Sequence, residues 1–156
     1  MKNLILYTLL LWGTAAMAQN EPRNINENDL WALGRVSGGQ LSPDKTMMLY
    51  GVSNYTVEKN TGTRTLYLYT FKDKTSTKII DGAYGEVWHP EGGKVGFLKA
   101  VKNRMHIHEY NLETKETTTI ENTPTFGVSN FSYSPTGEHI AFTQLKFLGN
   151  PTKDQH

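Results

Sequence analysis

Short stretches of alternating hydrophobic and polar residues run through most of the chain, and three of them follow the same kind of turn. Residues 41–44 (Leu-Ser-Pro-Asp) precede the stretch 47–52, residues 88–91 (Trp-His-Pro-Glu) precede 95–98, and residues 134–137 (Ser-Pro-Thr-Gly) precede 140–143. The three prolines stand 47 and then 45 residues apart. Proline presets φ and cannot donate to a strand ladder, so it fits the end of a strand beside a turn. Each of the three units therefore predicts a β-hairpin.

A second piece of sequence repeats between these turns. The stretch 66–71 aligns with 105–110, 39 residues later, which puts His106 where Tyr67 stands and His108 where Tyr69 stands. A polar turn and a threonine-rich strand follow in both places, at 76–80 and 117–120. The first stretch has apolar residues on both faces, as expected of a sheet packed between two other sheets. Helical periodicity is found nowhere after residue 35.

A repeat of about 45 residues with four short strands is typical of a β-propeller blade. We therefore predict an all-β fold, an incomplete propeller with two full four-stranded blades at about 36–81 and 83–122 and half of a third at 128–147. The partial propeller as a whole occupies residues 36–156. Propellers close with about four to eight blades, and such units bury their faces only against neighbours. We expect the chain to be the N-terminal part of a larger protein.

The first eighteen residues have the pattern of a secretory signal peptide. Lys2 precedes an apolar run over residues 4–12, and small residues lead to an Ala-x-Ala end at Ala18. Residues 19–35 form a lead-in, which is polar over residues 19–28. Within it, residues 29–33 are expected to form one helical turn, capped by Asn28 or Asp29 and ended by Gly34.

Composition narrows the class of protein further. Hydrophobic residues make up 37% of the chain and charged residues 20%, which argues against disorder. A formal net charge of +1, without a block of basic residues, disfavours a nucleic-acid partner. The chain has no cysteine, which excludes a disulfide scaffold and a zinc–thiolate site. An exported chain without cysteine fits the bacterial envelope, so we expect a periplasmic location with no membrane contact after signal cleavage.

Two serines approach the Gly-x-Ser-x-Gly pattern of a hydrolase nucleophile. Ser53 and Ser129 each follow Gly-Val, but the final glycine is absent in both places. Neither serine precedes a helical pattern, which the nucleophile turn of such hydrolases requires. We interpret both as ordinary turn residues beside strands.

The histidines offer a possible metal pair. His106 and His108 alternate along a strand and would share one face, but the repeat favours packing between blades, and no third ligand has suitable spacing. His89 takes the serine position of a Ser-Pro turn and His139 begins a strand, so both are interpreted as structural. We assign no catalytic, cofactor-binding or metal-binding residue in this chain, and no cofactor.

Residues 29–36 (Asp-Leu-Trp-Ala-Leu-Gly-Arg-Val), 41–44 (Leu-Ser-Pro-Asp) and 49–53 (Leu-Tyr-Gly-Val-Ser) carry a family resemblance. They are similar to the opening of the propeller in the prolyl oligopeptidase family of serine peptidases, above all to exported dipeptidyl peptidases and acylaminoacyl-peptidase-like enzymes of the Bacteroidetes. The turn motif of the family is Ser-Pro-Asp-Gly. Here Lys45 stands at the glycine position, His89 replaces serine and Thr136 replaces aspartate.

The resemblance implies that catalysis and control of substrate access belong to different domains. In the family, a C-terminal α/β-hydrolase domain carries the Ser-Asp-His triad, and the propeller gates the active site and helps to bind the peptide. None of the triad residues has a counterpart in this chain. The resemblance thus implies a non-catalytic segment whose partners are that hydrolase domain and a peptide substrate. The alternative is a TolB-like periplasmic propeller that contacts other proteins, because the Ser-Pro motif is shared with such propellers.

Overall fold

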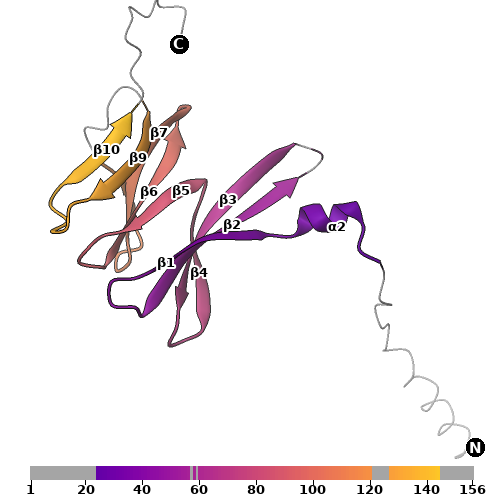
Figure 1. Cartoon of the computed structure of the whole chain (residues 1–156), viewed down its shortest axis with the longest axis horizontal. Coiled ribbons are helices and arrows are strands. Elements are labelled where there is room, and N and C mark those ends of the chain that lie inside the picture. Colours follow the sequence, from indigo (N-terminus) through magenta and orange to yellow (C-terminus); the bar gives the residue numbers. More distant parts are fainter. Residues whose placement is uncertain (1–23, 57, 59, 121–126, 145–156) are drawn as a thin grey trace, which may run out of the picture. The chain divides into compact units, whose positions relative to one another are not determined.

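The computed structural model describes residues 24–56, 58, 60–120 and 127–144 (Figure 1). Several predicted parts lie outside the described residues. These are the signal peptide at residues 1–18, residues 19–23 of the lead-in, residues 57 and 59 of the first repeat, residues 121–122 of the second and residues 145–156 of the partial propeller. The chain divides into two compact units, Met1–Leu30 and Trp31–His156. No helix within the described ranges is long and apolar enough to cross a membrane.

The lead-in ends in the short helix α2, Glu27–Ala32, which begins two residues before the predicted helical turn. The predicted cap is wrong, because Asn26 holds that position. The Asp29 N–H donates to Asn26 Oδ1 at 3.1 Å, and the Asn26 N–H donates to Asp29 Oδ2 at 2.9 Å. This reciprocal pair is a capping box, which satisfies two donors at the helix start. The Asn-x-x-Asp spacing that carries it starts before the residues chosen from the apolar pattern.

Ten strands in the described residues form three antiparallel sheets, one after another along the chain. Blade 1 contains β1 (Arg35–Leu41), β2 (Met47–Thr56), β3 (Thr61–Thr70) and β4 (Thr75–Asp81) in that order. Blade 2 contains β5 (Ala83–Trp88), β6 (Lys94–Val101), β7 (Arg104–Asn111) and β8 (Thr117–Thr119). The hairpin of β9 (Val128–Tyr133) and β10 (Ile140–Gln144) forms the third sheet. The predicted all-β fold of two four-stranded blades and half of a third is confirmed.

The turn between the first two strands has the same geometry in each sheet. In blade 1 the Ser42 N–H donates to the Met47 carbonyl at 2.9 Å, and Lys45 has a φ of 61°. Gly92 and Gly137 stand at the equivalent positions, each with a φ of 75°. Glycine adopts this left-handed conformation readily, whereas other residues adopt it at a cost. The turn therefore survives the loss of the motif glycine at Lys45.

The third strands of the two blades correspond at an offset of 41 residues, not at the 39 taken from the sequence. Met48 and Val95 are equivalent, because each stands five residues after its turn proline. Met48 pairs with Tyr69 in blade 1, and Val95 pairs with Tyr110 in blade 2. Tyr69 and Tyr110 are therefore equivalent to each other.

The corrected offset changes the partners assigned to the two strand histidines. His108 is equivalent to Tyr67 rather than Tyr69, and His106 is equivalent to Thr65 rather than Tyr67. The error arose because the hairpin of β2 and β3 is six residues longer than that of β6 and β7, as the offsets of 47 and 41 show. A shift of two residues leaves every side chain on the same face of a strand, so alternation alone does not reveal it.

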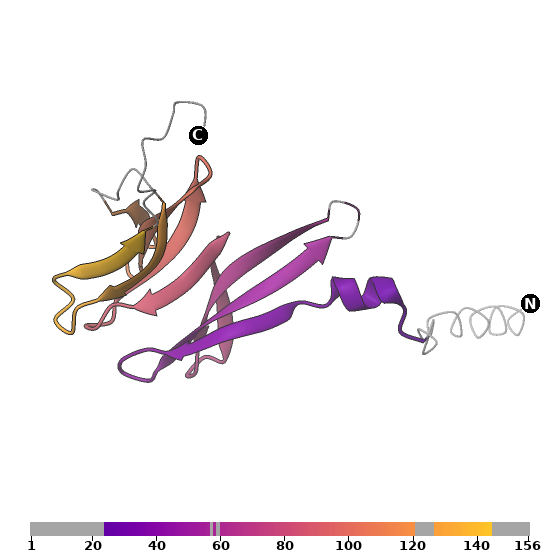
Figure 2. The same cartoon turned by 45° about the horizontal axis from the view of Figure 1, so that its top comes forward.

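The sheets lie face to face (Figure 2). Apolar side chains fill the space between them. Leu98 and Ile107 of blade 2 join Val128 and Phe131 of the third sheet in one cluster. Blade 2 thus buries both of its faces, as expected for a sheet between two others. The other cluster joins the first two blades and consists of Leu49, Leu66 and Leu68 from blade 1 with Ala83, Trp88, Val95, Phe97 and Tyr110 from blade 2.

Candidate functional site

The two serines considered as nucleophiles both lie within strands. Ser53 belongs to β2, and Ser129 belongs to β9, where its hydroxyl donates to the Thr143 carbonyl at 3.2 Å. The interpretation of both as turn residues is therefore wrong in that detail, because the strand continues through each position. A hydrolase nucleophile sits on a sharp strand-to-helix turn, and neither serine occupies such a turn.

His108 is buried at the interface of blades 1 and 2, with 7% of its surface exposed. Its ring stacks on Phe97 at a centroid distance of 5.7 Å, and its Nδ1 lies 3.1 Å from the Thr119 hydroxyl. Burial lowers the pKa of the imidazole, and the nearby charges of His106 and Lys99 act in the same direction. Among the described residues, no group of three or more His, Asp or Glu side chains is placed to hold a metal ion.

His89 and His139 lie beside turns. His89 is half-buried, accepts a hydrogen bond from the Glu91 N–H on its Nδ1 at 3.3 Å, and meets the Tyr133 ring edge-on at 5.0 Å. His139 is exposed just before β10, and its N–H donates to the Ser134 hydroxyl at 3.1 Å. The hydrogen bonds of His89 and His139 stabilise turn backbone, and the contact of His89 with Tyr133 joins blade 2 to the third sheet.

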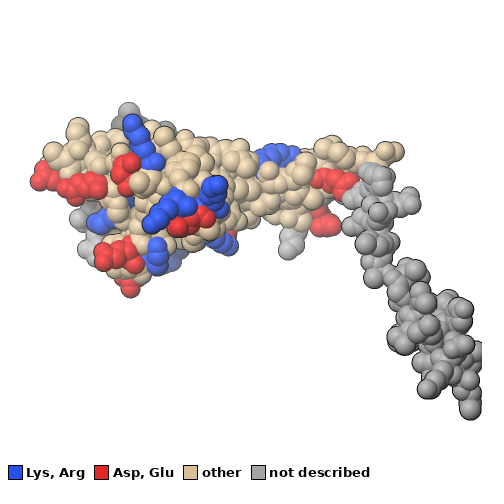
Figure 3. All heavy atoms as spheres, turned by 90° about the horizontal axis from the view of Figure 1, so that it is seen from below, with Lys and Arg blue, Asp and Glu red and all other residues tan. Residues whose placement is uncertain are grey.

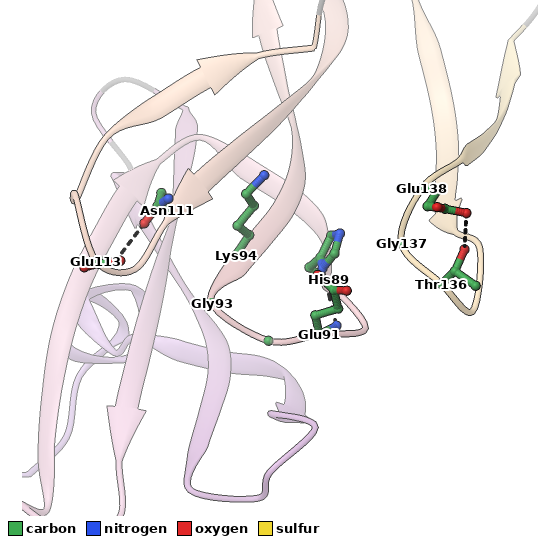
Figure 4. Close-up of a pocket in the computed structure, with 10 residues that line it drawn as sticks. His89, Glu91, Gly93, Lys94, Asn111, Glu113, Thr136, Gly137 and Glu138 are labelled. Carbon is green, nitrogen blue, oxygen red and sulfur yellow. Dashed lines mark hydrogen bonds between the residues drawn. The ribbon is translucent and has the colours of Figure 1, made fainter.

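A hollow of about 370 Å³ opens where the turns of blade 2 meet the turn of the third sheet (Figure 4). Three glutamates and one lysine give it mixed charge, and the Lys94 ammonium lies 3.5 Å from Glu109 Oε2. Local hydrogen bonds fix the turns themselves, such as the one from Thr136 Oγ1 to Glu138 Oε2 at 3.2 Å. The walls are turn residues, namely His89, Glu91, Gly92, Gly93, Lys94, Asn111, Glu113, Thr136, Gly137 and Glu138.

A buried ion pair joins blades 1 and 2, and no pattern in the sequence indicates it. Arg64 Nη1 and Nη2 donate to Glu86 Oε2 and Oε1 at 2.9 and 2.6 Å, and Nη1 also donates to the Ala83 carbonyl at 2.7 Å. The Arg64 and Glu86 side chains are 11% and 4% exposed. A bidentate contact of this kind fixes the relative orientation of the two side chains in addition to pairing their charges. We call this pair the clasp.

Glycines make the space that the clasp occupies. A Cβ at Gly51 would collide with the Arg64 guanidinium, and one at Gly38 would lie 2.6 Å from Glu86 Oε1. Gly38 also has a φ of 71°, in a region that favours glycine. The repeat does not reveal the clasp, because the positions equivalent to Arg64 and Glu86 in the next units are Met105 and Phe131.

The first strands of the two blades are joined beside the clasp. The Gln40 side-chain amide donates to the Glu86 carbonyl at 2.9 Å, and the Trp88 indole N–H donates to the Gln40 carbonyl at 3.1 Å. At the next interface, the Tyr133 hydroxyl donates to Glu109 Oε1 at 2.8 Å. Burial and the neighbouring carboxylate raise the pKa of that hydroxyl well above its usual value. Each blade interface thus combines an apolar cluster with a buried polar contact.

Charge is spread over the surface in both signs. On the face drawn in Figure 3, basic and acidic side chains interleave and no continuous basic area forms among the described residues. Aromatic side chains gather near the loop end of the long β2–β3 hairpin of blade 1, where Trp31, Arg35 and Tyr55 contact one another. This group is a second candidate surface.

The comparisons with known proteins agree on the type of fold. No protein-family model matches the chain. Dipeptidyl-peptidase 5 of Porphyromonas gingivalis is 29% identical over 149 residues, which cover 91% of this chain and 22% of that protein. The protein of the same name from Porphyromonas endodontalis is 22% identical over 130 residues, 81% of this chain and 19% of the relative. The chain therefore spans about a fifth of the length of these curated relatives.

Solved structures show the same architecture. The acylaminoacyl peptidase of Pyrococcus horikoshii matches with a TM-score of 0.69 and 15% identity, over 82% of this chain and 20% of that one. TolB from Acinetobacter baumannii matches with a TM-score of 0.55 and 19% identity, over 71% of this chain and 27% of that one. Taken with the two curated relatives, these matches confirm the resemblance to the propeller portion of prolyl oligopeptidase-type peptidases.

Proposed function

We propose that residues 36–156 are the non-catalytic N-terminal propeller segment of a longer exported serine peptidase, in which the propeller gates access and helps to bind the peptide. The observation that supports this best is the series of two complete blades and the start of a third, combined with relatives that are peptidases of much greater length. In this proposal residues 1–18 are a signal peptide, residues 19–35 are the lead-in, and the protein works in the periplasm.

The chemistry would reside outside this chain. A C-terminal α/β-hydrolase domain, beyond residue 156, would supply the catalytic Ser, Asp and His, and the parent would act as a dipeptidyl or acylaminoacyl exopeptidase. The placement of Ser53 and Ser129 within strands supports this division, because neither has the exposed turn that a nucleophile requires. The propeller would act by excluding large substrates from the hydrolase domain.

The outer face of blade 1 supports the gating role, because the last blade of a closed ring would pack against that face. All four of its strands come from residues 35–81, so no strand from elsewhere is needed to complete the sheet. Its outer face exposes Val36 and Leu41 by 70% and 54%, whereas the equivalent Ala83 and Trp88 of blade 2 are 0% and 7% exposed. A ring closed there would be held by face packing alone, and such a seam separates without breaking a strand ladder.

The test uses the parent protein, obtained by extending the reading frame beyond His156. We expect rapid cleavage of a chromogenic dipeptide substrate and slow cleavage of the same dipeptide at the end of a folded protein. Leu41→Asp should loosen the seam and raise the rate on the large substrate selectively, while Thr77→Asp on the exposed strand β4 should not. Equal rates on both substrates in the unmodified parent would contradict gating, and a parent without peptidase activity would contradict the whole proposal.

The alternative is a TolB-like periplasmic propeller that binds other proteins, and the match to TolB is the observation that favours it. The two functions differ in the sequence expected beyond residue 156. A Gly-x-Ser-x-Gly sequence downstream favours the peptidase, whereas further blades and then a stop codon favour the binding module. Co-purification of an envelope protein with a parent lacking hydrolase activity would support the alternative directly.

A further inference from the structure

The long hairpin of blade 1 extends past the part of the sheet that other blades cover. The β6–β7 ladder of blade 2 ends at Val101 and Arg104, which are equivalent to Asn54 and Thr63 of blade 1. The described residues between Tyr55 and Gly62 therefore lie beyond the end of the neighbouring sheet. A further blade of the size of blade 2 would not reach them, so packing within a propeller ring leaves this end of the hairpin uncovered.

An aromatic group with a cation stands at the base of this extension. Trp31 and Tyr55 meet edge to face at 6.4 Å and are 45% and 42% exposed. The Arg35 guanidinium lies over both rings, 4.6 Å from the Tyr55 centroid and 5.5 Å from the Trp31 centroid. Gly62 makes room for the tyrosine, because a Cβ there would lie 2.7 Å from Tyr55 Cε1. Each of the three side chains therefore contacts the other two.

A hollow of about 350 Å³ lies beside this group. Its volume falls near the lower end of the range for small ligand sites, about 300–1,000 Å³. The two aromatic rings form its apolar walls and short polar residues form its rim. Its described lining is Trp31, Tyr55, Thr56, Asn60, Thr61 and Gly62.

Arg35 does not line the hollow itself but lies over the two aromatic rings that do, which places a positive charge beside it. Its side chain is exposed and lies over the Trp31 and Tyr55 rings, and no ion pair found among the described residues joins it to a carboxylate. Stacking on two rings restricts the guanidinium while its N–H donors stay available to a carboxylate. Tryptophan, tyrosine and arginine are also the residues most enriched where binding energy concentrates.

We propose that Trp31, Arg35 and Tyr55 form a peptide-binding site that takes an apolar side chain in the hollow and a neighbouring carboxylate on Arg35. The ligand is a polypeptide segment in which a large apolar residue stands beside an acidic one. Charge complementarity selects this occupant over a purely apolar one. The site does not depend on the proposed peptidase, because it is built entirely from residues of this chain.

The test measures peptide binding to the full chain immobilised at low density, which keeps copies apart. The probes are acetyl-Phe-Glu-amide, acetyl-Phe-Gln-amide, acetyl-Phe-Lys-amide and acetyl-Ser-Glu-amide. We expect Phe-Glu to bind best, with loss of the carboxylate weakening binding by up to about fivefold, because the ion pair is exposed. Trp31→Ala should weaken binding of Phe-Glu by about tenfold or more.

A charge swap keeps the test decisive even if Trp31→Ala disturbs the fold. Arg35→Glu should reverse the preference, so that Phe-Lys binds better than Phe-Glu, while the control Lys72→Glu in the turn after β3 should leave the preference unchanged. Absence of saturable binding, equal binding of the Glu and Lys probes, or an unchanged preference in Arg35→Glu would overturn the proposal. Loss of a dimer of the chain on Trp31→Ala, without any peptide binding, would assign the surface to a second copy and also overturn it.

Discussion

Replacing Glu86 with glutamine removes the charge from the clasp while almost preserving its size. Arg64 would keep its bond to the Ala83 carbonyl at 2.7 Å and one bond to the glutamine Oε1, but the amide nitrogen that replaces the other carboxylate oxygen cannot accept the second bond. The guanidinium also loses its counter-charge and is only 11% exposed, so water replaces the lost interaction poorly. Breaking a buried pair by removing one partner costs about 3–5 kcal/mol. That is a large part of the free energy of unfolding of a whole domain, about 5–15 kcal/mol.

A second ion pair in the same blade supplies the control. Lys78 Nζ lies 2.6 Å from Asp81 Oδ2, the same distance as the shorter contact of the clasp, but these side chains are 54% and 50% exposed. Lys78→Met should therefore change stability far less than Glu86→Gln, because water solvates the remaining carboxylate. The double variant Arg64→Met with Glu86→Met should recover most of the loss, because no unpaired buried charge remains.

Urea unfolding of the mature chain at low protein concentration measures these differences. The Trp88 indole, which is 7% exposed and bonded to the Gln40 carbonyl, reports on the interface of the two blades by fluorescence. A loss of about 3 kcal/mol lowers the urea midpoint by about 1–3 M when the slope is about 1–3 kcal/mol/M. Equal shifts for Glu86→Gln and Lys78→Met, or a double variant no more stable than the single one, would refute the role of the clasp.

Three further results are expected. The pKa of His108 is lowered in the folded chain, so below about pH 6.5 the unfolded chain binds more protons and stability falls as pH drops towards the folded pKa. A pH series of urea midpoints should show a weaker fall in His108→Phe, and an equal fall would disprove the assignment. Gly51→Ala should destabilise the chain, because its Cβ collides with the Arg64 guanidinium, and thermal unfolding that matches the unmodified chain would be inconsistent with this packing. Residues 19–156 should not cleave dipeptidyl or acylaminoacyl chromogenic substrates, and turnover that is lost on Ser53→Ala or Ser129→Ala would show that the chain is itself an enzyme.

The blades could be predicted from sequence because their turns carry distinctive residues. The three prolines, the positions of Lys45, Gly92 and Gly137, and the strands next to them mark each hairpin through local chemistry alone. The predicted alignment of the third strands of blades 1 and 2 is off by two residues. The hairpin of blade 1 is longer, and no residue type in the sequence distinguishes its extra residues from the rest of the strand. The predicted alternation was nevertheless correct, since a shift of two preserves the face.

The contacts between blades were beyond the reach of the sequence pattern. Arg64 and Glu86 are 22 residues apart on different sheets and resemble two ordinary surface charges. Only their burial beside Gly38 and Gly51 makes them a clasp. The group around Arg35 was missed in a similar way, because its two aromatic partners lie on either side of β1 in the sequence. The predicted start of helix α2 is two residues too late, because the prediction followed the apolar residues and not the spacing of the capping residues.

The most direct test of the central claim is the size of the native protein. An antibody raised against residues 36–144 would be used to probe the periplasmic fraction of the cells that make the protein, with intact mass measured on the captured product. The account predicts a polypeptide roughly four to five times as long as this chain, as in the similar dipeptidyl-peptidase 5, with peptidase activity in the captured material. A product no larger than the 17.6 kDa of this chain, without such activity, would contradict it.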